Sequence, residues 1–95
     1  MTQETEFELS YAQVCQACDN DTVWLTRIIE EEVISISGSP QEAGFSGYQL
    51  ARIRRARRIS RDFDASASAT ALILELLDEL EDLRKSLPAG AGSAA

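Results

Sequence analysis

The chain contains the stretch FSGYQLARIRRARRISRDF at residues 45–63, and a second stretch, ALILELLDELEDLRKSL, follows at residues 71–87. Both have apolar residues spaced three and four apart, which is the pattern of amphipathic helices rather than strands. The first helix is rich in arginine and the second in leucine and acids. The sequence therefore predicts that two consecutive helices organise the fold, with the rest of the chain packed around them.

Capping signals predict where these two helices begin and end. Ser46 and Gln49 have the spacing of a capping box, so the arginine helix is expected to start there and to end near residues 62–64. Ser66 is the predicted N-cap of the leucine helix, which ends before Pro88 because proline cannot continue a helix.

A helix-turn-helix is predicted upstream of these helices. Ser10, with a glutamine three residues later, forms another capping box and starts a first helix. Asp19 and Asn20 indicate a tight turn, and Asn20 or Asp21 caps a second helix that runs to about Glu31. Residues 33–45 then change to β-branched residues interrupted by glycine and proline, which predicts a small hairpin or wing. The expected fold is mainly α-helical: a helix-turn-helix, a wing, an arginine helix and a leucine helix.

Each of the two long helices carries a charged stripe at positions i, i+3, i+4 and i+7. The arginine stripe consists of Arg54, Arg57, Arg58 and Arg61. The acidic stripe consists of Glu75, Asp78, Glu79 and Asp82. Apolar residues occupy the other side of each helix: Ile53, Ala56, Ile59 and Phe63 on the first, Ile73, Leu76, Leu77, Leu80, Leu83 and Leu87 on the second. Because each stripe lies opposite its own helix's apolar face, the two stripes are not expected to pair with each other, and both are expected to be available to a partner.

The leucine helix also has the 3,4 spacing of a short coiled-coil seam. This leucine seam consists of Ile73, Leu76, Leu80, Leu83 and Leu87. About two heptads are marginal alone, so the seam is expected to pack either on the arginine helix of its own chain or against a second subunit. The spacing leaves both alternatives open, and the second would make the protein a homodimer.

Composition indicates one small folded domain. The chain has 95 residues, 44% hydrophobic and 26% charged, with a net charge of −7, and six arginines without any acid lie in residues 50–61. We expect a flexible N-terminus at residues 1–5, a domain at 6–87 and a disordered tail at 88–95. Neither a membrane-length apolar run nor a signal-peptide pattern is present, so a cytoplasmic protein is expected.

The residue types limit the chemistry. The chain has no histidine, and its two cysteines, Cys15 and Cys18, supply only two of the four ligands that a structural zinc needs. Both are expected to be small apolar residues of the first helix. No set of nucleophile, base and oxyanion donors is evident, so neither an enzyme nor a metal or other cofactor is expected.

In this order of elements the chain resembles the chaperone-modulator family typified by CbpM, within the MerR-like winged-helix superfamily. The resemblance is carried by Phe45, Ser46, Tyr48, Leu50 and the run RIRRARRISRDF, together with the leucine helix and CQACDNDTVWL at residues 15–25. The chain departs from the family pattern at three turns, where Glu32, Asp19 with Asn20, and Asp64 with Ala65 replace glycine-containing steps. A left-handed Glu32 would cost on the order of 1 kcal/mol, so the second helix is expected to end in a different way.

The resemblance implies a non-enzymatic protein that binds the J-domain of a DnaJ-like co-chaperone of the CbpA type, competes with the DnaK chaperone and reduces DNA association. J-domains present a basic helix, so an acidic surface should face them. The candidate contact residues are Glu30, Glu31 and Glu32, the acidic stripe, and Trp24 as an apolar anchor. MerR-like proteins commonly dimerise through a C-terminal helix, so the resemblance also favours a homodimer.

Other interpretations stay open. Both acidic clusters can be solvated faces, and Trp24 can belong to the core. The arginine stripe can be solvated, can contact an acidic partner or can bind DNA phosphates, which would suit a MerR-like transcriptional regulator. Sequence-specific DNA binding is disfavoured because the second helix, DTVWLTRIIEEE, is acidic where a recognition helix would approach DNA. A dimerisation module for an unrelated protein is a third possibility.

Overall fold

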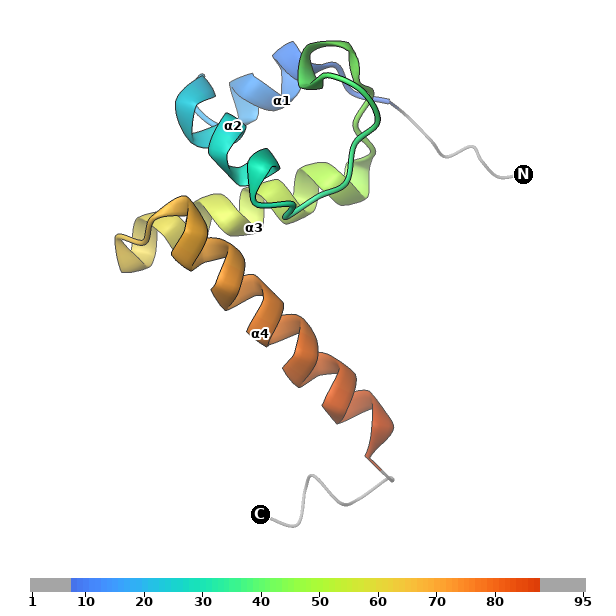
Figure 1. Ribbon diagram of the computed structural model, residues 1–95, viewed down its shortest axis with the longest axis vertical. Coiled ribbons are helices and arrows are strands. Elements are labelled where there is room, and N and C mark those ends of the chain that lie inside the picture. Colours follow the sequence, from blue (N-terminus) through green and yellow to red (C-terminus); the bar gives the residue numbers. More distant parts are fainter. Residues whose placement is uncertain (1–7, 88–95) are drawn as a thin grey trace, which may run out of the picture.

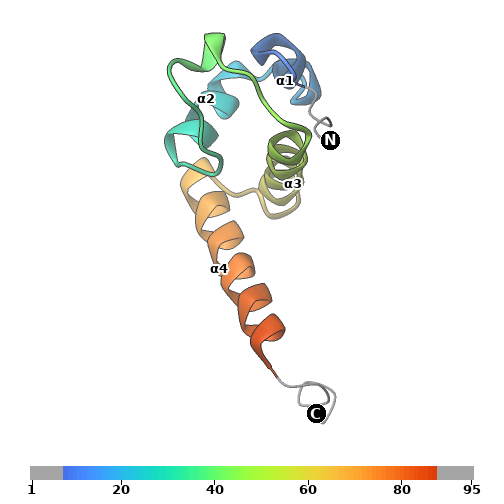
Figure 2. The same cartoon turned by 90° about the vertical axis from the view of Figure 1, so that its right-hand side faces the viewer.

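The computed structural model describes residues 8–87, so the expectations for residues 1–5 and 88–95 lie outside the described residues. Its elements, in chain order, are α1 (Tyr11–Ala17), α2 (Thr22–Glu30), the short 3-10 helix η1 (Pro40–Glu42), α3 (Gly47–Phe63) and α4 (Ala67–Ser86). Helices α1 and α2 and the following loop lie over one side of α3, and α4 extends away from them (Figures 1 and 2). The predicted mainly helical fold class, a helix-turn-helix followed by two long helices, is confirmed.

The predicted caps form. Ser46 Oγ accepts from Gln49 N at 3.0 Å, and Gln49 Oε1 accepts from Ser46 N at 3.0 Å, so the capping box is reciprocal. Ser10 forms the same box at the start of α1. Asp21 caps α2 through the Trp24 amide at 3.1 Å, and Ser66 caps α4. These local bonds satisfy amide groups that each helix start would otherwise leave without partners.

The expectation that the second helix ends without a left-handed residue at Glu32 is wrong. Glu32 adopts the left-handed conformation, with φ of +63°. Its N–H donates to the Ile29 carbonyl at 2.9 Å, and the Val33 N–H donates to Ile28 at 3.4 Å. This is a Schellman ending, in which Val33 is buried. The other three left-handed residues apart from glycine are Asp19, Asn20 and Asp64. The turns that lack glycine therefore keep the geometry that glycine favours.

Residues 33–45 form an irregular loop that serves as the wing, and the expected hairpin does not form. Within this fully described segment the only β-pairing is a bridge from Phe45 to Leu9, with N···O distances of 2.8 and 2.7 Å. Pro40 lacks the N–H that a strand ladder needs and begins η1 instead. Val33, Ile34 and Phe45 turn inward and are buried, so the wing forms part of the core.

The core gathers side chains from every long element. Its fully buried members include Val14, Cys18, Leu25, Ile28, Phe45, Ile53, Ala56 and Leu74. Phe63, which we expected on the apolar side of α3, is 70% exposed because it lies in the last turn of the helix, next to the chain reversal into α4.

The leucine helix buries a different face from the one that its spacing predicts. Its buried residues are Ala67, Thr70 and Leu74, all in the N-terminal half. Leu76, Leu80, Leu83 and Leu87 of the leucine seam are 54, 50, 63 and 50% exposed. Only Ile73 of the seam, with Leu77 beside it, packs against the core. From Leu76 onward the seam therefore does not pack on its own chain, because α4 docks through the face that carries Ala67, Thr70 and Leu74. The rest of the helix runs beyond the domain (Figure 1).

Candidate protein-binding surface

The fold brings the two acidic clusters of the sequence together. Glu31, at the end of α2, accepts a hydrogen bond from Ser68 of α4, with Oε2 and Oγ 2.8 Å apart. The groove between these helices has a volume of about 330 Å³. Its lining includes Glu31, Glu32, Ser68, Leu72, Glu75 and Asp78, with Arg52 as its one cation. Because four carboxylates outnumber one guanidinium, we call it the acidic groove. An adjoining hollow, which shares Glu31 and Ser68, adds Val23 and Glu30.

The acidic groove has apolar edges as well as charge. Leu72, which lines the groove, is 55% exposed, and Val23, which lines the adjoining hollow, is 65% exposed. Glu79 and Asp82 are exposed as well, but they lie farther along α4 and do not line the groove. The surface thus combines carboxylates with apolar contact area, as a protein-binding patch does.

Asp78 is already partnered, so the expectation that the whole acidic stripe is available is wrong for this residue. Arg52 donates to Asp78 at 2.8 Å, and its Nε donates to the Val33 carbonyl at 2.7 Å. One guanidinium thereby joins α3, the wing and α4. Sequence analysis missed Arg52 because it lies outside the arginine stripe. It precedes Ala56 by four residues and Ile59 by seven, and this spacing could have indicated that it lies on the buried side of α3.

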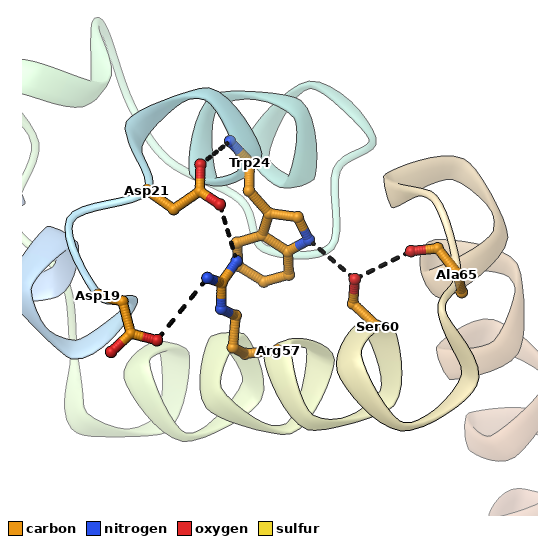
Figure 3. Close-up of polar contacts among 6 residues, drawn as sticks. All are labelled: Asp19, Asp21, Trp24, Arg57, Ser60 and Ala65. Atoms are coloured by element: carbon orange, nitrogen blue, oxygen red, sulfur yellow. Dashed lines mark hydrogen bonds and ion pairs between the residues drawn. The ribbon is translucent and has the colours of Figure 1, made fainter.

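Trp24 is engaged inside the chain (Figure 3). Its indole N–H donates to Ser60 Oγ at 3.3 Å, and that hydroxyl donates to the Ala65 carbonyl at 2.9 Å. The Arg57 guanidinium lies 4.8 Å from the centroid of the Trp24 ring, within the range of a cation–π contact. The indole is partly buried and ties α2 to α3, so its interpretation as part of the core accounts for these contacts.

Arg57 is likewise held by its neighbours. It donates to Asp21 at 3.2 Å and lies 3.7 Å from Asp19, so the turn between α1 and α2 is bound to α3. The Trp24 amide and then the Arg57 guanidinium hold the pKa of Asp21 below its usual value. Part of the Arg57 guanidinium is thus already used within the chain, which corrects the expectation that this member of the stripe is wholly available to a partner.

The other three members of the arginine stripe, Arg54, Arg58 and Arg61, are exposed. In the described part of the chain no arginine of this stripe pairs with the acidic stripe, as the sequence predicts. The two charged surfaces are therefore separate features of the molecule.

The cysteines lie in the core. Cys15 and Cys18 are buried free thiols, and burial raises the pKa of the Cys18 thiol. Among residues 8–87, no group of three or more histidine, cysteine, aspartate or glutamate side chains could hold a metal ion. No helix in the same range is both long and apolar enough to cross a membrane.

The helix-turn-helix of α1 and α2, the wing and the two long helices define a MerR-like helix-turn-helix protein. The family model described as MerR HTH family regulatory protein matches residues 9–88. Two relatives, from Pseudomonas entomophila (strain L48) and Pseudomonas putida (strain W619), are each called "Chaperone modulatory protein CbpM". Each is 30% identical over 78 residues, which span 81% of this chain and 77% of the relative. The chain belongs to this CbpM family of chaperone modulatory proteins. No solved structure matches it.

Proposed function

We propose that this chain is a non-enzymatic modulator that binds the J-domain of a DnaJ-like, CbpA-type co-chaperone in the cytoplasm and inhibits its co-chaperone and DNA-binding activities. Membership of a family of chaperone modulatory proteins supports the general role. The observation that carries the proposal is the acidic groove, in which glutamates distant in sequence, such as Glu31 and Glu75, line one hollow.

The acidic groove has the properties that a basic helix of a J-domain requires. Complementary charge accelerates association and selects among partners, whereas lasting affinity needs buried apolar contacts. The carboxylates of Glu31 and Glu75 supply the charge, and the exposed side chains of Val23 and Leu72 supply apolar contacts beside it. Because Trp24 already bonds inside the chain, we assign the apolar contact to these two residues in its place. Glu79 and Asp82 extend the negative surface along α4.

The test is a calorimetric titration of this protein with the isolated J-domain of the co-chaperone from the same organism. Glu75→Lys is expected to weaken binding about tenfold, which corresponds to about 1.4 kcal/mol, and wild-type affinity should fall with added salt. The matched control is Glu42→Lys, which makes the same charge change at an exposed residue of η1, outside the groove. Unchanged binding by Glu75→Lys would remove the groove from the interface, and absent wild-type binding would refute the proposed partner.

We also propose that the chain forms a homodimer through the leucine seam. Leu76, Leu80 and Leu83 are each at least half exposed on one face of a helix that extends beyond its own domain. Exposed apolar surface of this kind is covered in most soluble proteins. A second copy brings an identical seam and can cover it by coiled-coil packing.

The alternative of a MerR-like DNA-binding regulator has less support. In a helix-turn-helix protein the second helix approaches the bases, and here the end of α2 presents the exposed carboxylates of Glu30 and Glu31. Phosphates would be repelled there. Duplex DNA added in place of the J-domain is therefore expected to give no sequence-specific binding.

A further inference from the structure

A second pocket lies where the turn after α1 meets α3, and it has no residue in common with the acidic groove. Its volume is about 250 Å³. It is lined by Ala17, Asp19 and the whole arginine stripe, Arg54, Arg57, Arg58 and Arg61. In an acidic chain this pocket is a concentrated positive site, and we call it the arginine pocket.

The arginines of this pocket repel one another. Arg54 and Arg58 lie four residues apart on α3, as do Arg57 and Arg61, and like charges at this spacing destabilise a helix. Asp19 is the only acid that lines the pocket. Its carboxylate lies 3.7 Å from Arg57, and in the part of the chain that the structure describes no carboxylate forms an ion pair with Arg54, Arg58 or Arg61. A bound anion would remove this repulsion.

Arg57 forms a fixed side of the pocket. Its side chain is only 19% exposed, because Trp24 covers one face of the guanidinium and Asp21 accepts from one of its nitrogens (Figure 3). A guanidinium that is already oriented loses little freedom when an anion binds. Asp19, in contrast, is 73% exposed and makes the longer contact, so a stronger anion can displace it.

The length and charge of the pocket indicate the ligand. Guanidinium groups pair with phosphate oxygens through two parallel hydrogen bonds. From Arg54 to Arg61 the row extends roughly 10 Å along the helix, at about 1.5 Å per residue, which is longer than one tetrahedral phosphate can bridge. We infer that the arginine pocket binds a short condensed phosphate of two or three phosphoryl groups, either free or as the tail of a nucleotide.

A long polyanion fits this site less well than a short one. Asp62 and Asp64 are exposed beside the row at the end of α3, and Asp19 lies at the pocket itself. Duplex DNA would have to continue past these carboxylates onto an acidic protein of net charge −7. A short phosphate chain ends inside the pocket and avoids that repulsion.

The test combines titration calorimetry with thermal unfolding of the full chain, in buffers matched for ionic strength with sodium chloride. Tripolyphosphate and pyrophosphate are expected to bind and to raise the unfolding temperature, whereas orthophosphate should bind at least tenfold more weakly. A titration with ATP in the absence of magnesium distinguishes a nucleotide tail from free condensed phosphate. Affinity equal to that of tripolyphosphate indicates that a nucleotide tail is accepted, and much weaker affinity restricts the site to free condensed phosphate.

Three variants connect binding to the pocket. Arg58→Ala and Arg61→Ala should each lower tripolyphosphate affinity at least tenfold, whereas Asp19→Asn should raise it. The matched control is Arg55→Ala, on the same helix but outside the pocket lining, and it should bind normally. No stabilisation beyond the chloride control, an equal loss in Arg55→Ala, or tighter binding of duplex DNA than of tripolyphosphate would each overturn the inference.

Discussion

Shortening one leucine of the leucine seam should weaken self-association without weakening the folded chain. Leu80 is 50% exposed in the single chain. Full burial of a leucine contributes about 1.5–3 kcal/mol, so covering the exposed half contributes about half of that. In a two-fold dimer each substitution acts twice. Leu80→Ala is therefore expected to cost about 1.5–3 kcal/mol of dimerisation energy, roughly a ten- to hundredfold rise in Kd. This is an upper estimate, because alanine keeps the Cβ.

Sedimentation equilibrium over a wide concentration range measures this effect directly. Alanine has a slightly better helix propensity than leucine, so the helix content of Leu80→Ala should be unchanged by circular dichroism. Val23→Ala is the matched control, because Val23 is an exposed apolar residue of α2, 65% exposed, and lies away from the seam. It should dimerise as the wild type does.

Two results would refute this reasoning. One is a wild-type chain that stays monomeric at every concentration, and the other is an equal shift in Leu80→Ala and Val23→Ala. If the wild type is monomeric and Leu80→Ala instead loses affinity for the J-domain, the leucine seam is covered by the co-chaperone and not by a second copy.

Four further substitutions test the contacts of the fold. Arg52→Ala should lower the free energy of unfolding in urea by about 1.5–3 kcal/mol. The loss should exceed that of Asp78→Ala, because Arg52→Ala also removes the hydrogen bond to the Val33 carbonyl of the wing. Equal losses would show that the bond to the wing contributes nothing. Thr70→Val should stabilise by about 1 kcal/mol, since the buried Thr70 hydroxyl has no hydrogen-bond partner within the described residues; a lower melting temperature would contradict this. The pKa of Asp21 is lowered, first by the Trp24 amide, so its stabilisation is present above the pKa of the unfolded chain and is lost as the pH falls through the folded pKa. Asp21→Asn should therefore be less stable than wild type at neutral pH and equal to it in acid, and a gap that persists in acid would argue against the charge.

Local signals in the sequence were sufficient for much of the fold. The predicted caps at Ser10, Ser46 and Ser66 all form, because a cap depends on residues within one turn of the chain. The wing was harder to predict. Its β-branched residues suggested a hairpin, but Val33 and Ile34 are used by the core instead, and no local pattern reveals that competition.

The candidate surfaces were likewise predictable from the sequence only where they depend on neighbouring residues. Periodicity placed charges on helix faces, but it could not indicate that Arg57 is held by Asp21 and Trp24, because those contacts join residues more than thirty positions apart. Periodicity also could not indicate that Arg52 forms an ion pair with Asp78. Such long-range ion pairs depend on how helices are docked, so they remove charges from a surface that the sequence alone would count as free.

The sequence by itself determined the helices, their starting residues, the family and the sign of each charged face, since all of these are encoded in neighbouring residues and in helical spacing. Only the tertiary structure decided which face of α4 is buried and which glutamates share a groove. Leu74 enters the core while the leucine seam from Leu76 onward stays outside, and Glu31 meets the side of α4 that carries Glu75. The physical reason is that periodicity defines faces relative to a helix axis, whereas the docking of one helix on another chooses among those faces.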